Sequence, residues 1–212
     1  MSPKKTQRLP AAQRRELLLM AAAEHFATRG YHAADIESIA AAAGVTKVIA
    51  YRAFGSKQAL YQALLDQHRD ELLATLVASQ QLDHADAPKR ICAGLDAWFA
   101  YVESHPFAWR LLVRDTTGLA ELEAHHRQMR AQARAVIGRL LIDHLSVATT
   151  DAAPTAEFLR SAIVGVALWW LENPNVDRPE IAATAHRLIC GALKHISVPD
   201  GRPRSSVARQ LA

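Results

Sequence analysis

The sequence lacks most features of membrane-spanning, secreted or β-rich proteins. No segment approaches the roughly 18 uncharged apolar residues that a membrane-spanning helix needs. The N-terminus, MSPKKTQRLPAAQRRE, has no apolar stretch of the kind found in a secretion signal. Runs of alternating β-branched residues flanked by hairpin turns are nearly absent. We therefore expect an all-α protein in the cytoplasm, without a membrane partner.

Motifs typical of catalytic, phosphate-binding or metal-binding sites are also scarce. The chain has 2 cysteines, Cys92 and Cys190, and both stand among apolar residues at helical spacing, which predicts buried reduced thiols. There is no glycine-rich phosphate loop, GxSxG elbow or HExxH motif. His125 and His126 point about 100° apart on a helix. Glu121 with His125 lacks a third ligand. We therefore predict no enzyme, and assign no catalytic residue, metal site or cofactor.

The net charge of +4 is unevenly distributed along the chain. Basic residues outnumber acidic ones by five in residues 1–60, whereas acidic residues outnumber basic ones by three in residues 61–196. Residues 197–212 add two positive charges. A basic end on a mildly acidic body indicates that one end of the protein meets a polyanion.

Helical periodicity runs through almost the whole chain. Glycines and prolines divide it, and Asp35 and Thr46 are suited to cap the second and third helices. We expect about nine helices, over residues 13–29, 36–43, 47–53, 57–79, 88–105, 107–115, 119–145, 155–172 and 179–196. The last residues, 197–212, have the composition of a disordered tail.

The stretch GVTKVIAYRAFGSKQAL, residues 44–60, predicts the second half of a helix-turn-helix. One face of its first helix carries Lys47, Val48, Tyr51 and Arg52. Lysine and arginine donate to base edges in the major groove, and a small apolar group such as Val48 meets the thymine methyl. Ala50 falls on the opposite face, which suits packing against the preceding helices.

Further residues of this region suit contacts with phosphate. Tyr51, at the edge of the outward face, can donate its hydroxyl, and Thr46 and Lys57 stand at helix starts beside free backbone N–H groups. Glu37, outward on the preceding helix, either reaches a base or is solvated, and both alternatives stay open. The predicted DNA-binding residues are therefore Thr46, Lys47, Val48, Tyr51, Arg52, Lys57 and Glu37.

Residues 14–65 closely resemble the DNA-binding domain of the TetR family of bacterial transcriptional regulators. The resemblance is carried by Phe26, Gly30-Tyr31, the IAAAAGVTK segment, Tyr51, Phe54 and the SKxxL pattern at 56–60. It implies that three N-terminal helices bind DNA and that the remaining helices form a ligand-binding and dimerisation body. Where the family often has Gly-Thr-Leu, this chain has Val48-Ile49-Ala50, so an operator sequence cannot be transferred from relatives.

The resemblance divides the chain into a DNA-binding domain (1–56), an effector-binding and dimerisation domain (57–196) and a flexible tail (197–212). Half-sites one helical turn apart favour a homodimer. The helix expected over 155–172 is apolar around more than half of its circumference, so its second face needs a cover. That cover is either the chain's own core or a partner, and the predicted dimer residues are Phe158, Ala162, Gly165, Val166, Trp169, Leu188, Ala192 and His195.

The central helices carry aromatic and polar residues that are predicted to line an effector pocket. These residues are Trp98, Tyr101, Phe107, Trp109, His125, His126, Met129 and Trp170. Such a lining predicts a mostly apolar or aromatic small-molecule effector, with one histidine as a polar contact. A plain hydrophobic core is the alternative for the same residues.

Together these features predict a TetR-like transcriptional regulator that binds a double-stranded DNA operator. By family habit it is a repressor, released from a palindromic operator by its effector. Two alternatives stay open. A nonspecific DNA-organising protein would bind all sequences equally, and a ligand-binding helical bundle with a vestigial helix-turn-helix would keep its activity without residues 1–60.

Overall fold

The computed structural model describes residues 9–80, 87–114, 117–145 and 147–196. Over these ranges the chain forms nine helices and no strand, which confirms the predicted all-α fold. The predicted tail, 197–212, lies outside the described residues. The helices are α1 (Ala11–Ala33), α2 (Ile36–Ala42), α3 (Lys47–Phe54), α4 (Lys57–Gln80), α5 (Ala87–Ser104), α6 (Pro106–Val113), α7 (Ala120–Leu145), α8 (Thr149–Glu172) and α9 (Arg178–Ile196).

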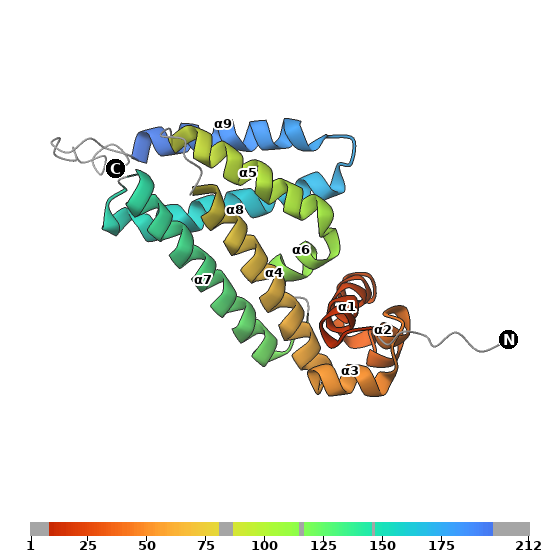
Figure 1. The fold of residues 1–212 in the computed structure, drawn as a ribbon. Coiled ribbons are helices and arrows are strands. Elements are labelled where there is room, and N and C mark those ends of the chain that lie inside the picture. Colours follow the sequence, from red (N-terminus) through yellow and green to blue (C-terminus); the bar gives the residue numbers. More distant parts are fainter. Residues whose placement is uncertain (1–8, 81–86, 115–116, 146, 197–212) are drawn as a thin grey trace.

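The helices form two groups joined by long elements. Figure 1 shows α1, α2 and α3 together at one end and α5, α8 and α9 at the other, with α4 and α7 running between the two ends. The short α6 packs against α1 and so joins the two groups. None of the described helices combines the length and apolarity needed to cross a membrane.

The predicted capping signals set the boundaries of α2 and α3. The Asp35 side chain accepts a hydrogen bond of 2.9 Å from the backbone N–H of Ser38. The Thr46 hydroxyl accepts one of 3.4 Å from the N–H of Ile49. Gly55 ends α3 at φ 79°, a conformation that side chains disfavour. Local chemistry therefore determines both ends of α3.

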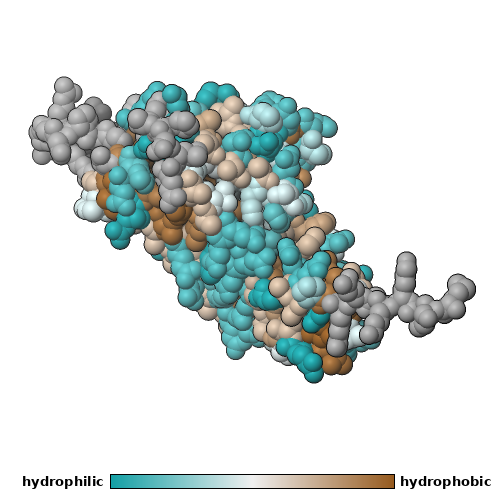
Figure 2. Space-filling model, viewed as in Figure 1, coloured by the Kyte–Doolittle hydropathy of each residue, from teal (hydrophilic) through white to brown (hydrophobic). Residues whose placement is uncertain are grey.

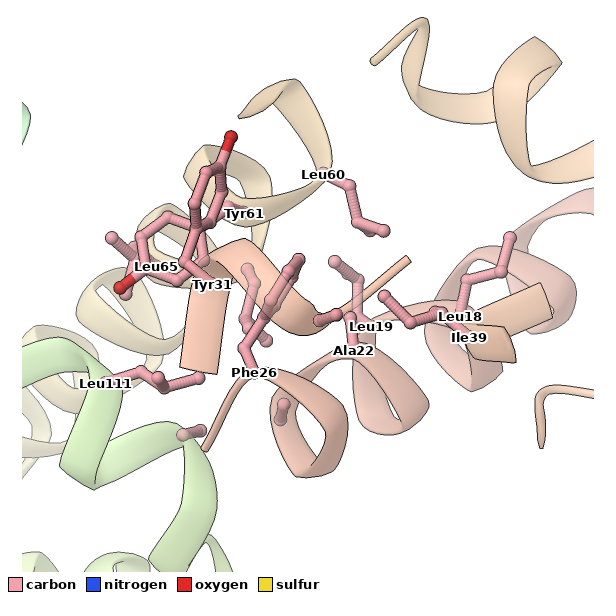
Figure 3. Packing of buried hydrophobic residues seen from close by; sticks show 14 of the residues in the cluster. Leu18, Leu19, Ala22, Phe26, Tyr31, Ile39, Leu60, Tyr61, Leu65 and Leu111 are labelled. Carbon is pink, nitrogen blue, oxygen red and sulfur yellow. The ribbon is translucent and has the colours of Figure 1, made fainter. Parts of the chain in front are cut away.

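An aromatic cluster holds the N-terminal helices together (Figure 3). Phe26 is 1% exposed, and its ring lies 5.1 Å from that of Tyr61 in an edge-on contact. Tyr31 stacks on Phe26 at 5.7 Å. Leu111 of α6 belongs to the same cluster, so this core continues from the N-terminal helices into the body. Movement of one part therefore requires repacking at the other.

Helix α8 begins at Thr149, before the expected start at 155. The helix runs through Pro154, which suggested a loop in the sequence. Ala152 is buried against α7, and its carbonyl oxygen would lie 3.7 Å from a Cβ added at Gly138. The first turns of α8 therefore pack closely on α7 although a proline follows them.

The predicted burial of the thiols is wrong for Cys92. Both cysteines are free, but Cys92 is exposed and Cys190 is half-buried. Cys92 shares a helical face with Asp96, which is exposed as well. Apolar neighbours in the sequence therefore did not place this residue in the core.

Candidate functional site

The outward face of α3 presents most of the residues predicted to bind DNA. Thr46, Lys47, Val48, Tyr51 and Arg52 are all exposed. Val48 is 69% exposed, an unusual position for a valine, and the apolar colour at the α3 tip is visible in Figure 2. On the inner side, Ala50 is buried in the core as expected, and the partly buried Phe54 packs against the same core. Burial of one side of α3 leaves cationic and apolar groups together on the other.

Glu37 forms an ion pair with Lys47 on this surface. The Nζ of Lys47 donates to Oε2 of Glu37 at 3.1 Å, and both side chains are more than half exposed. This hydrogen bond raises the pKa of Lys47. Exposed pairs contribute little to stability. The pair therefore mainly orients the Lys47 side chain on this surface.

Lys57 has a different environment. Its ammonium donates to three backbone carbonyl oxygens, those of Tyr31 (2.9 Å), His32 (3.3 Å) and Ala34 (3.0 Å). It also lies 4.6 Å from the centre of the Tyr31 ring. Lysine has only three donors, so all of them are in use. The phosphate contact of Lys57 stays a prediction, because the structure gives this side chain another role in joining α4 to the end of α1.

The body contains a cavity of about 220 Å³ that is lined mainly by aliphatic side chains. Of the predicted pocket residues, Trp98, Trp109 and Met129 line it. Figure 2 shows apolar side chains gathered at the end of the body where α7 meets α8, and Leu141 and Leu145 of this end belong to the lining.

Three arginines also reach the cavity. Arg69 pairs with Asp66 and Asp70, and Arg160 pairs with Glu157. Arg130 is half-buried and makes no ion pair or hydrogen bond with any residue that the structure describes. It is the cation most available to an acidic group in this apolar space, and sequence periodicity did not single it out.

The other predicted pocket residues do not line this cavity: Tyr101, Phe107, His125, His126 and Trp170. Each of them has contacts elsewhere. The Nε2 of His125 lies 3.1 Å from Oδ1 of Asp66 on α4. His126 is 1% exposed in the core beside Tyr61, and the indole N–H of Trp170 donates to the Val176 carbonyl at 2.7 Å.

Phe107 and Tyr101 are also turned away from the cavity. Phe107 packs against the aromatic cluster of the N-terminal helices. Tyr101 takes part in a polar network with His68, Glu71 and His105 at the junction of α4 with α5 and α6. Burial lowers the pKa of His68 and raises that of Tyr101. The i, i+3 spacing of His68 and Glu71 was visible in the sequence, but only the fold brings His105 to them.

The predicted dimer face is uncovered in the single chain. Phe158, Trp169 and Leu188 are 58%, 50% and 62% exposed. Between them on α8, Ala162 and Gly165 are exposed and Val166 is half-buried; on α9, Ala192 is half-buried, and the side chain of His195 lies outside the described part. The alternative that this stripe is intramolecular core is therefore wrong for its three large side chains.

Comparisons with known proteins agree with this geometry. The model of the family described as "Bacterial regulatory proteins, tetR family" matches residues 18–64. The transcriptional activator FasR of Mycolicibacterium smegmatis is 29% identical over 197 residues, which cover 89% of this chain and 87% of that protein. A TetR-like regulator from Rhodococcus sp. RHA1 has the same fold, with a TM-score of 0.71, 23% identity, and 88% and 99% of the two chains covered. The chain belongs to the TetR family.

Other relatives support the same assignment. The regulator AlkX of Mycobacterium tuberculosis is 28% identical over 82% of both chains. The fatty acid degradation regulator FadR of Bacillus halodurans shares the fold, with a TM-score of 0.73 at 17% identity, covering 89% of this chain and 99% of that one. This protein is thus a TetR-family transcriptional regulator with a helix-turn-helix DNA-binding region, and its relatives are regulators, not enzymes.

In this TetR-family regulator, replacing Lys57 with methionine is expected to destabilise the N-terminal helices. The substitution keeps a similar apolar stem and leaves three carbonyls without their charged donor, which costs about 1.5–3 kcal/mol of unfolding free energy. Urea denaturation followed by circular dichroism measures this loss. Unchanged stability together with a shallower salt dependence of DNA binding would favour the phosphate contact instead.

Proposed function

We propose that a homodimer of this chain binds a palindromic operator and represses transcription until a small apolar effector releases it. The observation that carries the proposal is the exposure of Lys47, Val48 and Arg52 on one face of α3, while Ala50 on the other face is buried. Base-edge donors and a thymine-contacting methyl group on one helical face are what major-groove readout needs.

The exposed valine also separates this proposal from nonspecific DNA binding. Phosphate contacts alone give affinity without sequence preference. They need cations and hydroxyls but no apolar group. At 69% exposure, Val48 is held where it would meet a base edge and exclude water from it. We therefore assign Lys47, Val48 and Arg52 to the bases, and Thr46 and Tyr51 to the phosphates beside them.

The dimer is proposed through the uncovered face of α8 and α9. Phe158, Trp169 and Leu188 together offer a large apolar area, and the small residues Ala162 and Gly165 lie between the first two. Small residues permit two helices to approach closely. A two-fold axis through this face would pair α8 and α9 of both copies and present two α3 helices to one duplex.

The effector is proposed to occupy the cavity of the body. The lining is mainly aliphatic with two tryptophans, and Arg130 adds a cation that has no ion pair among the described residues. An apolar ligand with one acidic group would satisfy both features. Leu72 and Leu76 of α4 line the same cavity, and α4 begins at Lys57, directly after α3. A ligand that moves α4 would therefore change the separation of the two reading helices.

The DNA-binding part of the proposal is tested with DNA from the protein's own promoter region and with random DNA. We expect the wild type to prefer one promoter sequence at two salt concentrations. Arg52→Ala should lose about 1–3 kcal/mol of discrimination at particular base pairs. Fluorescence anisotropy measures both affinities, and Arg29→Ala, an exposed arginine of α1, is the control. Equal wild-type affinity for all sequences would contradict the regulator proposal and favour nonspecific binding.

A separate experiment distinguishes repression from activation. FasR is named an activator, so relatives do not decide it. If the protein represses, a reporter driven by the bound promoter should increase when the gene for the regulator is deleted. A decrease would show activation.

Filling the cavity is expected to prevent binding of the effector without changing binding of DNA. Ala133 of α7 lines the cavity and is half-buried. Ala133→Trp should leave DNA affinity unchanged and prevent binding of an apolar sulfonated fluorescent dye, used as a probe for the effector. Dye binding to the wild type and to Ala133→Trp with equal affinity would place the apolar ligand site elsewhere. Ala131→Trp, on an exposed part of the same helix, is the matched control.

A further inference from the structure

We propose that His68, Glu71 and His105 form a site for a divalent transition metal ion, with Zn²⁺ as the best match. One ligand atom from each residue lies within 4.8 Å of the others. His68 and Glu71 stand one turn apart on α4, and His105 directly precedes α6. The ion would thus connect α4 to the corner between α5 and α6. This inference does not depend on the proposed function.

The distances suit a small ion with nitrogen and oxygen ligands. In a tetrahedral zinc site with bonds of about 2.0–2.2 Å, neighbouring ligand atoms lie about 3.4 Å apart. Nδ1 of His68 and Oε2 of Glu71 are already 3.4 Å apart. The ring of His105 lies 5.2 Å from the ring of His68, centre to centre. Only a small movement of the His105 side chain would complete a three-ligand set.

The surroundings of His105 select the tautomer that a metal needs. Its Nδ1 lies 3.1 Å from the carbonyl oxygen of Tyr101 and 2.9 Å from the hydroxyl of Ser104. That hydroxyl is itself placed to donate to the carbonyls of Ala100 and Tyr101. Nδ1 therefore carries the proton, and Nε2 keeps its lone pair. A backbone carbonyl that orients a histidine in this way is the usual support of a metal ligand.

The Tyr101 hydroxyl lies between two of the potential ligands, His68 and Glu71. Its hydroxyl donates to Oε2 of Glu71 at 2.9 Å and contacts Nδ1 of His68. A metal ion would take over this bridging position, and water would complete the fourth coordination place. His68 is 7% exposed, whereas the Glu71 side chain is 41% exposed, so the ion can enter from solvent on the glutamate side.

The nearby charges leave the site available to a cation. Arg69, the neighbour of His68, is paired with Asp66 and Asp70. No lysine or arginine among the described residues forms an ion pair with Glu71. Oε2 of the carboxylate faces a buried imidazole and a phenol, and Oε1 accepts a hydrogen bond of 3.0 Å from the neutral side-chain amide of Gln67. A hydrogen-bonded network without metal remains the competing explanation, and the experiment below separates the two.

The test uses the untagged full-length chain after removal of metal by a chelator. Zn²⁺ is titrated in competition with a chromophoric chelator, and Co²⁺ is added in parallel to follow its visible absorption. We expect one equivalent per chain, a tetrahedral Co²⁺ spectrum and a raised unfolding temperature. His105→Ala should weaken Zn²⁺ binding by at least about 10-fold. His144→Ala, at an exposed histidine of α7, should bind as the wild type does.

Two further variants keep the result clear. Tyr101→Phe removes the bridging hydroxyl but none of the three ligands, and should retain Zn²⁺ binding. Glu71→Gln alters an accessible ligand without removing a buried ring, and should weaken binding even if His105→Ala is unstable. Absence of Zn²⁺ binding to the wild type, or equal affinity in Glu71→Gln, His105→Ala and His144→Ala, would overturn the proposal and leave a structural hydrogen-bond network.

Discussion

Replacing Leu188 with arginine is expected to convert the proposed dimer to folded monomers and to weaken operator binding by about 100-fold or more. Leu188 is 62% exposed in the single chain, so the substitution disturbs little of the protomer's own core. In a dimer, two arginines would lie without partners in an apolar contact, which costs several kcal/mol. A monomer would then hold the operator through one reading helix only. Analytical ultracentrifugation measures the mass, and fluorescence anisotropy measures the affinity.

The control for this experiment is Val77→Arg. Val77 is 41% exposed on α4, a helix that contributes no residue to the proposed dimer face, and the variant should stay dimeric. Trp169→Asp provides a second disruption of the same face from α8, where Trp169 is 50% exposed. If Leu188→Arg and Trp169→Asp both form dimers as stable as the wild type, the interface lies on another surface of the molecule.

Replacing Phe26 with alanine is expected to lower the free energy of unfolding by about 3–5 kcal/mol. Phe26 contacts Tyr31 and Tyr61, and a cavity would remain between helices that are held together by these rings. The loss is a large share of the about 5–15 kcal/mol that stabilises a typical domain. Because α1 supports α2 and α3, we also expect sequence-specific DNA binding to be lost.

Urea denaturation measures the change in stability, and hydrogen exchange shows where it occurs. Met20→Ala is the matched control, since Met20 belongs to the same helix but is 64% exposed and should change stability by no more than about 0.5 kcal/mol. Exchange should accelerate mainly in α1, α2 and α3. Equal stability of the Phe26→Ala and Met20→Ala variants would show that the aromatic cluster does not hold the N-terminal helices together.

The reading helix illustrates what can be predicted from a sequence. Thr46 caps α3 and Gly55 ends it, as predicted, because capping and positive φ depend on residues close in the chain. The 3.6-residue period then places Lys47 and Arg52 on the side opposite Ala50. The same period predicted the uncovered stripe with Phe158 and Trp169, because a helix that is apolar on two faces needs more than one packing partner.

The cavity shows the limit of this reasoning. Trp98, Trp109 and Met129 line it, but Tyr101, His125 and Trp170 have the same sequence character and do not. A sequence pattern predicts that an apolar or aromatic side chain is buried, but it does not distinguish a side chain that lines a cavity from one that packs against other side chains. The sequence could not show that Arg130 has no ion pair among the described residues. Whether an arginine is paired depends on which acidic residues the fold brings near it.

By itself, the sequence determined the helical fold, the boundaries of the helix-turn-helix and the face of α3 that is exposed, because these depend on contacts within a few residues. Only the tertiary structure decided that Lys57 reaches the carbonyls of α1 and that His105 meets His68 and Glu71. These contacts join residues more than twenty positions apart. Their partners are chosen by the packing of whole helices, which periodicity within a single helix does not specify.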